Sequence, residues 1–294
     1  MVILRKEIVK RRKSRNSYCP RTSFRRKLLG QHFLTSGEVK DRIISSLGSL
    51  EDKHVLEIGA GRGELTFELA ERAGRLTALE IDSRLAEKLE LAFKEMPQVS
   101  ILREDALQFD YARWAASCAP LKPLVVGNIP YRITNSLLYA LIGSHNLLGT
   151  VVLMLQEEVA RKLNTSAGQK PYGMLTVFVS YNSEVEYLFR VGRENFSPRP
   201  KVDSALVKLD FAKPCQRRAD DEALFEALVR RLFLNRRKQI QKILRHDHRF
   251  AVSAEEIARL EQSTGLKLSC RPEELRVEQL VALADSLSDM KVKT

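Results

Sequence analysis

The chain has 294 residues, 44% of them hydrophobic, and no apolar run reaches the ~18 residues that a membrane-spanning helix needs. A chain of this length is typical of about two domains, each with a core of its own. The four cysteines stand at positions 19, 118, 215 and 270, too far apart for a zinc knuckle or a redox pair. We therefore expect no metal site and a reducing compartment.

The net charge of +12 is concentrated in two segments. Residues 1–29 hold eleven Lys and Arg against one acid, and residues 222–250 hold eight against three, so the rest of the chain carries −3. Basic clusters of this kind are typical of nucleic-acid binding. We predict a basic N-terminal arm at residues 1–29 and a basic helical face with Arg230, Arg231, Arg236, Arg237 and Lys238. A solvated tail and a mitochondrial transit peptide are the alternatives for the arm.

Strands and helices alternate after the arm. A helical stripe of apolar residues at 38–47 comes first. Strands are then predicted at residues 54–58, 76–81, 99–102, 124–126 and 151–155, and helices at residues 63–72, 83–93 and 136–142. Two later apolar segments, 175–181 and 204–211, are predicted to be further strands of the same layer. This order favours an α/β fold in which a parallel, Rossmann-like sheet has helices on both faces.

Beyond residue 211 the pattern becomes purely helical. A helix is predicted at residues 222–244, a capping box of Ser253 and Glu256 begins the next helix, and Gly265 ends it. Pro272 suits the first turn of a last helix at residues 273–287. The predicted domains are the arm at 1–29, an α/β domain at 30–211, and a small all-helical domain at 212–294 that binds RNA or the ribosome.

A glycine loop, Gly59-Ala60-Gly61, joins the first predicted strand to its helix, which lets the backbone approach a ligand closely. Glu80 ends the second strand, where its carboxylate can accept both hydroxyls of a ribose. Glu64 occupies the sixth position of the G-x-G-x-x-G pattern, and its charge disfavours the pyrophosphate of a dinucleotide. A nucleoside ligand without phosphates, such as S-adenosylmethionine, fits better. Asp105, after the third strand, can accept from an adenine amine.

The strand that begins at residue 124 leads into Asn128-Ile129-Pro130-Tyr131, which suits methyl transfer to an adenine amine. The side-chain carbonyl of Asn128 and the main-chain carbonyl of Pro130 can each accept one amine hydrogen, which directs the nitrogen lone pair at the methyl group. Tyr131 offers a face on which the base can stack, an interaction that contributes roughly 1–3 kcal/mol in nucleic-acid sites. We expect such an enzyme to use positioning and electrostatics rather than a titrating base.

Five motifs in order carry a resemblance to a known family: GQHFL (30–34), EIGAG (57–61), NIPY (128–131), FSPRPKVDS (196–204) and FLNRRK (233–238). In these motifs the chain resembles the ribosomal RNA adenine dimethyltransferases of the KsgA type, over nearly its whole length after the arm. The resemblance implies an S-adenosylmethionine-dependent enzyme that dimethylates two adjacent adenines. These adenines would lie in a hairpin loop near the 3′ end of small-subunit rRNA, which implies a role in small-subunit biogenesis.

The resemblance also implies roles for single residues. Together with the loop residue Gly61, the positions expected to contact the cofactor are His32, Leu34, Gly59, Glu80, Asp105 and Asn128. Asn128, Pro130 and Tyr131 are expected to act on the target base, with Phe196 stacking opposite Tyr131. Three residues depart from the family pattern: His32 where Asn is common, Arg132 where Asn is usual, and Ser136 where Pro is usual. The last two concern how the substrate is positioned rather than the reaction.

Two other functions stay open. Erm-type enzymes, which modify a large-subunit adenine, share the glycine loop and NIPY, but FLNRRKQIQKIL (233–244) favours the KsgA type. A ribosome assembly factor that has lost methylation is a different class, which the intact Asn128 and Glu80 disfavour. We expect a cytoplasmic monomer that binds small-subunit rRNA or a particle like the pre-30S subunit, and no membrane.

Overall fold

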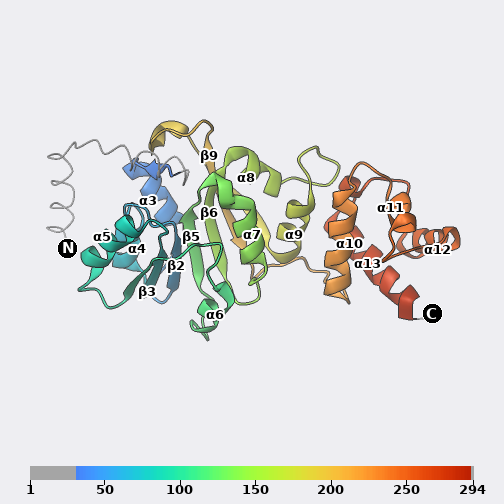
Figure 1. The fold of residues 1–294 in the computed structure, drawn as a ribbon, viewed down its shortest axis with the longest axis horizontal. Helices are drawn as coiled ribbons and strands as arrows, with labels where there is room; N and C mark the ends of the chain where they lie inside the picture. Colours follow the sequence, from blue (N-terminus) through green and yellow to red (C-terminus); the bar gives the residue numbers. More distant parts are fainter. Residues whose placement is uncertain (1–30, 293–294) are drawn as a thin grey trace.

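The computed structural model describes residues 31–292, so the predicted arm at residues 1–29 lies outside the described residues. Figure 1 shows an elongated molecule in which a central sheet, covered by helices, is followed by a group of helices toward the C-terminus. Within residues 31–292, no helix combines the length and the apolar character that crossing a membrane requires.

The central sheet has seven strands in the order β4-β3-β2-β5-β6-β9-β7. They are β2 (His54–Ile58), β3 (Arg75–Leu79), β4 (Val99–Leu102), β5 (Leu124–Asn128), β6 (Thr150–Gln156), β7 (Glu184–Val191) and β9 (Ser204–Asp210). Strands β4, β3, β2, β5 and β6 are parallel, whereas β9 is antiparallel to both β6 and β7. The prediction of a wholly parallel sheet is therefore wrong at this edge. The segment between β7 and β9 contains no crossover helix, so the chain turns back on itself.

Alternate residues of the strands pack against helices on opposite faces of the sheet. Val55 of β2 belongs to the core of one face, and Leu56 and Ile58 belong to the core of the other. The first face is covered by α3 (Gly37–Ser46), α4 (Thr66–Arg72) and α5 (Ser83–Phe93), the second by α6 (Tyr111–Ala116), α7 (Thr134–Ile142) and α8 (Glu157–Leu163). Each large side chain buried in these cores contributes roughly 1.5–3 kcal/mol to folding. This arrangement confirms the predicted Rossmann-like fold with helices on both faces.

Residues 175–181, predicted as a strand, belong to helix α9 (Met174–Asn182), so this prediction is wrong. Leu175 and Val179 pack in the core under the sheet, whereas Phe178 and Tyr181 pack in the core of the C-terminal helices. A helix buried between two cores is apolar all round, so periodicity cannot distinguish it from a buried strand. Strand β7, which follows, is an edge strand with mostly part-exposed residues, and it was not predicted although Val185, Tyr187, Phe189 and Val191 alternate along it.

The C-terminal core is formed by α10 (Glu222–Leu234), α11 (Ile240–His246), α12 (Ala254–Thr264) and α13 (Val277–Val292), together with α9. The capping box of Ser253 and Glu256 is confirmed, and Gly265 ends α12 with a φ of 69°. The single helix predicted at 222–244 is two helices, because the polar run at 235–239 interrupts the apolar stripe. The last helix begins at Val277, after the short 3-10 turn Pro272–Glu274, and not at 273.

The predicted basic helical face is only partly helical. Residues 236–238 lie in the turn between α10 and α11 and not on a helix. Arg231 forms an ion pair with the buried Asp247, and Arg230 pairs with Glu226 at 2.6 Å. Residues 236–238 are all exposed, and of these three only Arg236 approaches a carboxylate within the described residues, that of Glu273 at 3.7 Å.

Candidate active site

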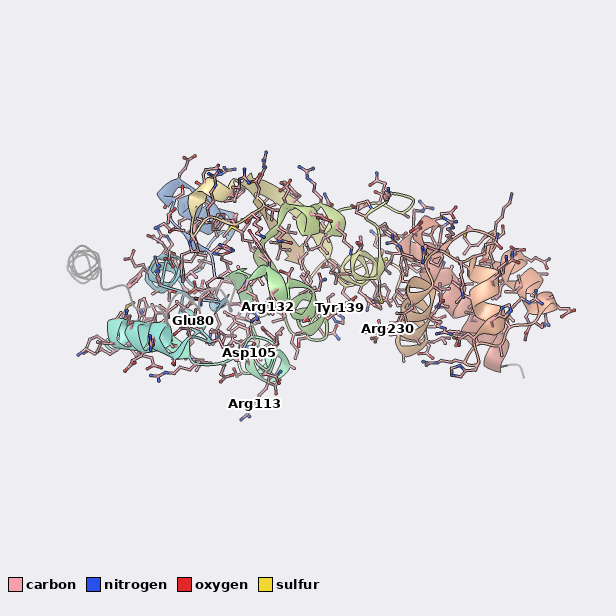
Figure 2. The ribbon with its side chains drawn as sticks, turned by 45° about the horizontal axis from the view of Figure 1, so that its top comes forward. Glu80, Asp105, Arg113, Arg132, Tyr139 and Arg230 are labelled. Carbon is pink, nitrogen blue, oxygen red and sulfur yellow. The ribbon has the colours of Figure 1, made fainter. Side chains whose placement is uncertain are left out.

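A cavity of about 360 Å³ opens at the carboxyl ends of β2, β3 and β5. Ligands of open α/β sheets bind at this edge, because the loops of neighbouring parallel strands meet there. Figure 2 shows Glu80, Asp105 and Arg132 at this end of the sheet. The cavity brings together every predicted site residue except Phe196: His32, Leu34, Gly59, Gly61, Glu80, Asp105, Asn128, Pro130 and Tyr131.

The loop after β2 turns along the cavity because its glycines adopt positive φ angles, 78° at Gly59 and 60° at Gly61. Residues with a Cβ seldom adopt this conformation. A Cβ on Gly61 would also lie 3.3 Å from the ring of Phe33, so the loop packs closely against the GQHFL segment. The two glycines therefore bring the main chain to the cavity wall with no side chain between the wall and a ligand.

Glu80 is 3% exposed and holds the glycine loop in place. Its Oε2 accepts a hydrogen bond from the backbone N–H of Gly61 at 2.7 Å, and its Oε1 accepts one from Asp82 at 2.8 Å. Burial raises the pKa of Glu80, although these two hydrogen bonds act to lower it. Each carboxylate oxygen can accept more than one hydrogen bond, so Glu80 keeps the capacity to bind ribose hydroxyls.

Two buried polar atoms at the cavity have no hydrogen-bond partner among the described residues, namely Oε1 of Gln31 and Oε2 of Glu57. An unpartnered buried polar group costs roughly 1–3 kcal/mol, which a ligand with matching groups removes. Burial raises the pKa of Glu57 to about 8; the Thr66 hydroxyl acts to lower it, and the nearby carboxylates of Glu64 and Glu80 act to raise it. S-adenosylmethionine carries ammonium, hydroxyl and amine donors and a carboxylate, so the residues present fit this cofactor.

The side chain of Asn128, the last residue of β5, is held in one orientation. Its Nδ2 donates to the main-chain carbonyl of His32 at 2.9 Å. The ring of His32 is fixed in turn, since its Nδ1 donates to the carbonyl of Pro198 at 2.7 Å. With Nδ2 engaged in this way, Oδ1 of Asn128 is left, within residues 31–292, as a preoriented acceptor at the cavity.

The rest of the NIPY motif is also anchored. The carbonyl of Pro130 accepts a hydrogen bond from the N–H of Ile133 at 3.0 Å and keeps a second lone pair. The hydroxyl of Tyr131 lies 2.8 Å from Oγ of Ser204, and its ring centroid lies 5.8 Å from that of His32. Burial raises the pKa of Tyr131, so its hydroxyl stays protonated at neutral pH. The aromatic ring is therefore fixed at the cavity wall.

Phe196 does not line the cavity. It is 5% exposed and lies in β8 (Phe196–Ser197), which pairs with β1 (Phe33–Leu34) in a small antiparallel sheet. Its side chain packs in the same core as Leu34 and Val191. Stacking of Phe196 on a target base stays a prediction, and it requires this side chain to leave the core.

Two cavity residues, Gln31 and Glu57, were not predicted as site residues, although their places in the sequence indicate a function. Gln31 follows the glycine that opens the GQHFL motif, and Glu57 lies inside an otherwise apolar strand between Leu56 and Ile58. A carboxyl group in such a strand is seldom fully buried unless it has a partner or a function. The Glu inside the strand was therefore a signal for a functional position.

Comparisons with known proteins agree with this geometry. The family model described as "Ribosomal RNA adenine dimethylase" matches residues 22–287. The ribosomal RNA small subunit methyltransferase A of Chromohalobacter salexigens is 38% identical over 270 residues, which are 90% of this chain and 92% of that protein. Its counterpart from Pseudomonas syringae pv. tomato is 35% identical over 264 residues, covering 90% and 95% of the two chains.

Two solved structures resemble the fold. The 23S rRNA methyltransferase ErmE has a TM-score of 0.66 and 28% identity, and the match covers 87% of this chain and 99% of that one. A dimethyladenosine transferase from Plasmodium falciparum has the same TM-score at 24% identity, covering 86% of this chain and 96% of that one, and shows likeness of fold. From the match of the family model over residues 22–287 and the identity to these relatives, the chain belongs to the ribosomal RNA adenine dimethylase family.

Proposed function

We propose that this protein transfers methyl groups from S-adenosylmethionine to two adjacent adenines of small-subunit rRNA, in a hairpin loop near the 3′ end, and brings each to the dimethyl state. The observation that carries the proposal is the fixed amide of Asn128, whose Nδ2 is bonded to His32 at 2.9 Å while Oδ1 remains as an acceptor. Membership of the family supports the reaction and the cofactor. The names of relatives at 35% and 38% identity support the small subunit as the target.

The NIPY motif holds the target amine in this proposal. In the first transfer, Oδ1 of Asn128 and the carbonyl of Pro130 each accept one hydrogen of the exocyclic amine, which turns the nitrogen lone pair out of conjugation with the ring. In the second transfer, one of these acceptors binds the single hydrogen that remains. S-adenosylmethionine, when bound, supplies an electrophilic methyl group. The two acceptors bind the amine more strongly as its nitrogen gains positive charge, so they stabilise the transition state more than the ground state. The methylated nitrogen then releases a proton to water, and no side chain has to titrate.

The cofactor is proposed to lie along the glycine loop. Glu80 would accept from the ribose hydroxyls with the capacity left after its bonds to Gly61 and Asp82. Asp105 lines the same cavity, and its Oδ1 accepts from the N–H of Leu107 at 2.9 Å, so Oδ2 is available for the adenine amine. His32, Leu34 and Gly59 would complete the contacts.

The RNA would be held outside the cavity. A target adenine must leave its stack to reach Tyr131, which costs least in a loop where pairing is already absent. We propose that the RNA is bound by the arm at 1–29 and by the basic turn at 236–238 of the helical domain at 212–294. We further propose that the protein acts as a monomer in the cytoplasm on a particle like the pre-30S subunit.

Methyl incorporation tests the proposal. Labelled S-adenosylmethionine is supplied with unmethylated small-subunit particles and, separately, with large-subunit particles, and the labelled nucleotides are mapped. We expect label on two adjacent adenines of the small-subunit RNA and none with the Asn128→Ala variant. Label in the large subunit would instead establish the Erm-type function. The 28% identity with ErmE supports that function less strongly than the 38% identity with a small-subunit methyltransferase supports the proposal. Absence of label from both particles would point to a non-catalytic assembly factor.

A further inference from the structure

We propose that Arg132 binds a backbone phosphate next to the target adenosine and so positions the RNA loop over the cavity. This inference rests on the proposed function and adds a substrate-positioning residue to it. Arg132 follows the NIPY motif directly and belongs to the 3-10 turn η2 (Tyr131–Ile133), which leads into α7.

The charged residues that line the cavity favour a phosphate at one position only. Five carboxyl side chains line it: Glu57, Glu64, Glu80, Glu104 and Asp105. Among the lining residues that the structure describes, Arg132 is the only Lys or Arg. A phosphate that approaches the cavity is repelled by the carboxylates of the interior and attracted at Arg132, so charge complementarity selects this residue as the contact.

The guanidinium of Arg132 is available for such a contact. The side chain is exposed, and no hydrogen bond, ion pair or ring contact joins it to another residue in the described range 31–292. The arginines of α10 differ, since Arg230 is paired with Glu226 and Arg231 with Asp247. An unengaged guanidinium can donate two parallel N–H groups to one phosphate, which fixes its orientation as well as its position.

The surface that leads to Arg132 suits a polyanion. Residues 131–149, which include η2 and α7, contain no Asp or Glu. Figure 2 shows Arg132, Tyr139 and Arg230 in a row from the cavity toward the C-terminal helices, and the guanidinium of Arg230 lies 5.8 Å from the ring of Tyr139. An RNA strand that follows α7 meets no carboxylate of this segment before it reaches the cavity. Because Arg132 adjoins Tyr131, the predicted stacking residue, the phosphate in its reach belongs to the target nucleotide or its neighbour.

Another anion could occupy the same guanidinium, namely the carboxylate of the methionine part of the cofactor. Arg132 is exposed and adjoins Tyr131, the predicted stacking residue, which favours the RNA. The two assignments differ in a measurable way, because one predicts an effect on RNA affinity and the other an effect on cofactor affinity.

The experiment compares Arg132→Ala and Arg132→Lys with the matched control Arg113→Ala. Arg113 is an exposed arginine on α6 whose side chain has no contact within the described residues, and Figure 2 places it at the outer margin of the molecule, away from the row. The full-length proteins are titrated with the rRNA hairpin at several salt concentrations and with S-adenosylmethionine, and their turnover on unmethylated small-subunit particles is measured. A second hairpin carries a neutral methylphosphonate at the phosphates flanking the target adenosine.

For Arg132→Ala we expect hairpin affinity about tenfold lower, and a slope of log affinity against log salt flatter by about 0.7, the value for one phosphate of a single strand. Arg132→Lys keeps the slope because it keeps the charge, and Arg113→Ala matches the wild type. The neutral hairpin weakens binding to the wild type but not to Arg132→Ala, since both changes remove the same contact.

Three results would overturn the inference. In the first, the hairpin affinity and salt slope of Arg132→Ala match those of Arg113→Ala, while the wild type methylates small-subunit particles. This result removes Arg132 from substrate binding and leaves the proposed function intact. Lower cofactor affinity with unchanged RNA affinity assigns Arg132 to the cofactor instead. A wild type that methylates no small-subunit particle overturns the proposed function, and the inference with it.

Discussion

Replacement of Asn128 by alanine removes the acceptor that we place at the target amine. The variant loses the Oδ1 acceptor and the hydrogen bond of 2.9 Å to the carbonyl of His32, but no large apolar contact. Loss of one preoriented polar group at a reacting centre lowers turnover by roughly 10²–10³, or about 2.7–4 kcal/mol. We therefore expect turnover at least about a hundredfold lower, with RNA affinity nearly unchanged, because the lost interaction strengthens only in the transition state.

Single-turnover methyl transfer with both substrates saturating measures this step directly. Asn164→Ala is the matched control, since Asn164 is an exposed amide at the C-terminal end of α8 and does not line the cavity. Near-normal turnover in Asn128→Ala would remove Asn128 from the chemistry. A loss of turnover matched by an equal loss of hairpin affinity would show that Asn128 binds substrate and transition state alike, which contradicts the proposed role.

Three further predictions follow from the charged groups. Glu80→Gln should weaken S-adenosylmethionine binding in calorimetry by about 2 kcal/mol, the scale of a lost charge-assisted hydrogen bond, and unchanged affinity would exclude Glu80 from the ribose site. Burial raises the pKa of Glu57 from 4.5 to about 8, so the stability from its retained proton is full below 4.5 and lost as the pH rises through about 8. The melting temperature of the wild type should therefore fall more steeply than that of Glu57→Gln between about pH 5 and about pH 9, and parallel curves would contradict this account. Deletion of residues 1–25 should flatten the salt slope of RNA binding by several units, at about −0.9 for each phosphate, with cofactor affinity kept. If the slopes of the full and shortened chains coincide, the arm is a solvated tail or a targeting segment.

Segments whose hydrophobic period matches their secondary structure were predictable from the sequence. The strand His54–Ile58, the helix Ser83–Phe93 and the strand Val99–Leu102 have the bounds that their patterns predict. Helix α9 contacts two cores at once, and its side chains at 175–181 are apolar on every side, so its sequence reads as a buried strand. The antiparallel edge was missed together with this helix, since taking 175–181 as a strand left the alternating segment of β7 unassigned.

The wall of the site was predictable, but its internal contacts were not. Motifs that end neighbouring parallel strands must meet at one edge of the sheet, so Gly59, Glu80 and Asn128 could be placed together without a structure. The hydrogen bonds within this wall depend on a few tenths of an ångström. The sequence therefore could not indicate that Glu80 already binds the backbone of Gly61, nor that Phe196 lies in the core.

The arrangement separates two ligands of opposite charge. The cofactor carries a positive sulfonium, and the cavity that fits it is lined by carboxyl groups. The RNA is a polyanion, and the basic groups assigned to it are Arg132 at the cavity, the arm at 1–29 and the turn at 236–238. Salt screens exposed charges strongly and buried charges much less. The affinity for the RNA can therefore fall without a change in the affinity for the cofactor. Dimethylation of two adjacent bases requires the loop to be presented more than once. A few salt-screened contacts permit that exchange, whereas a deep basic groove around the target would resist it.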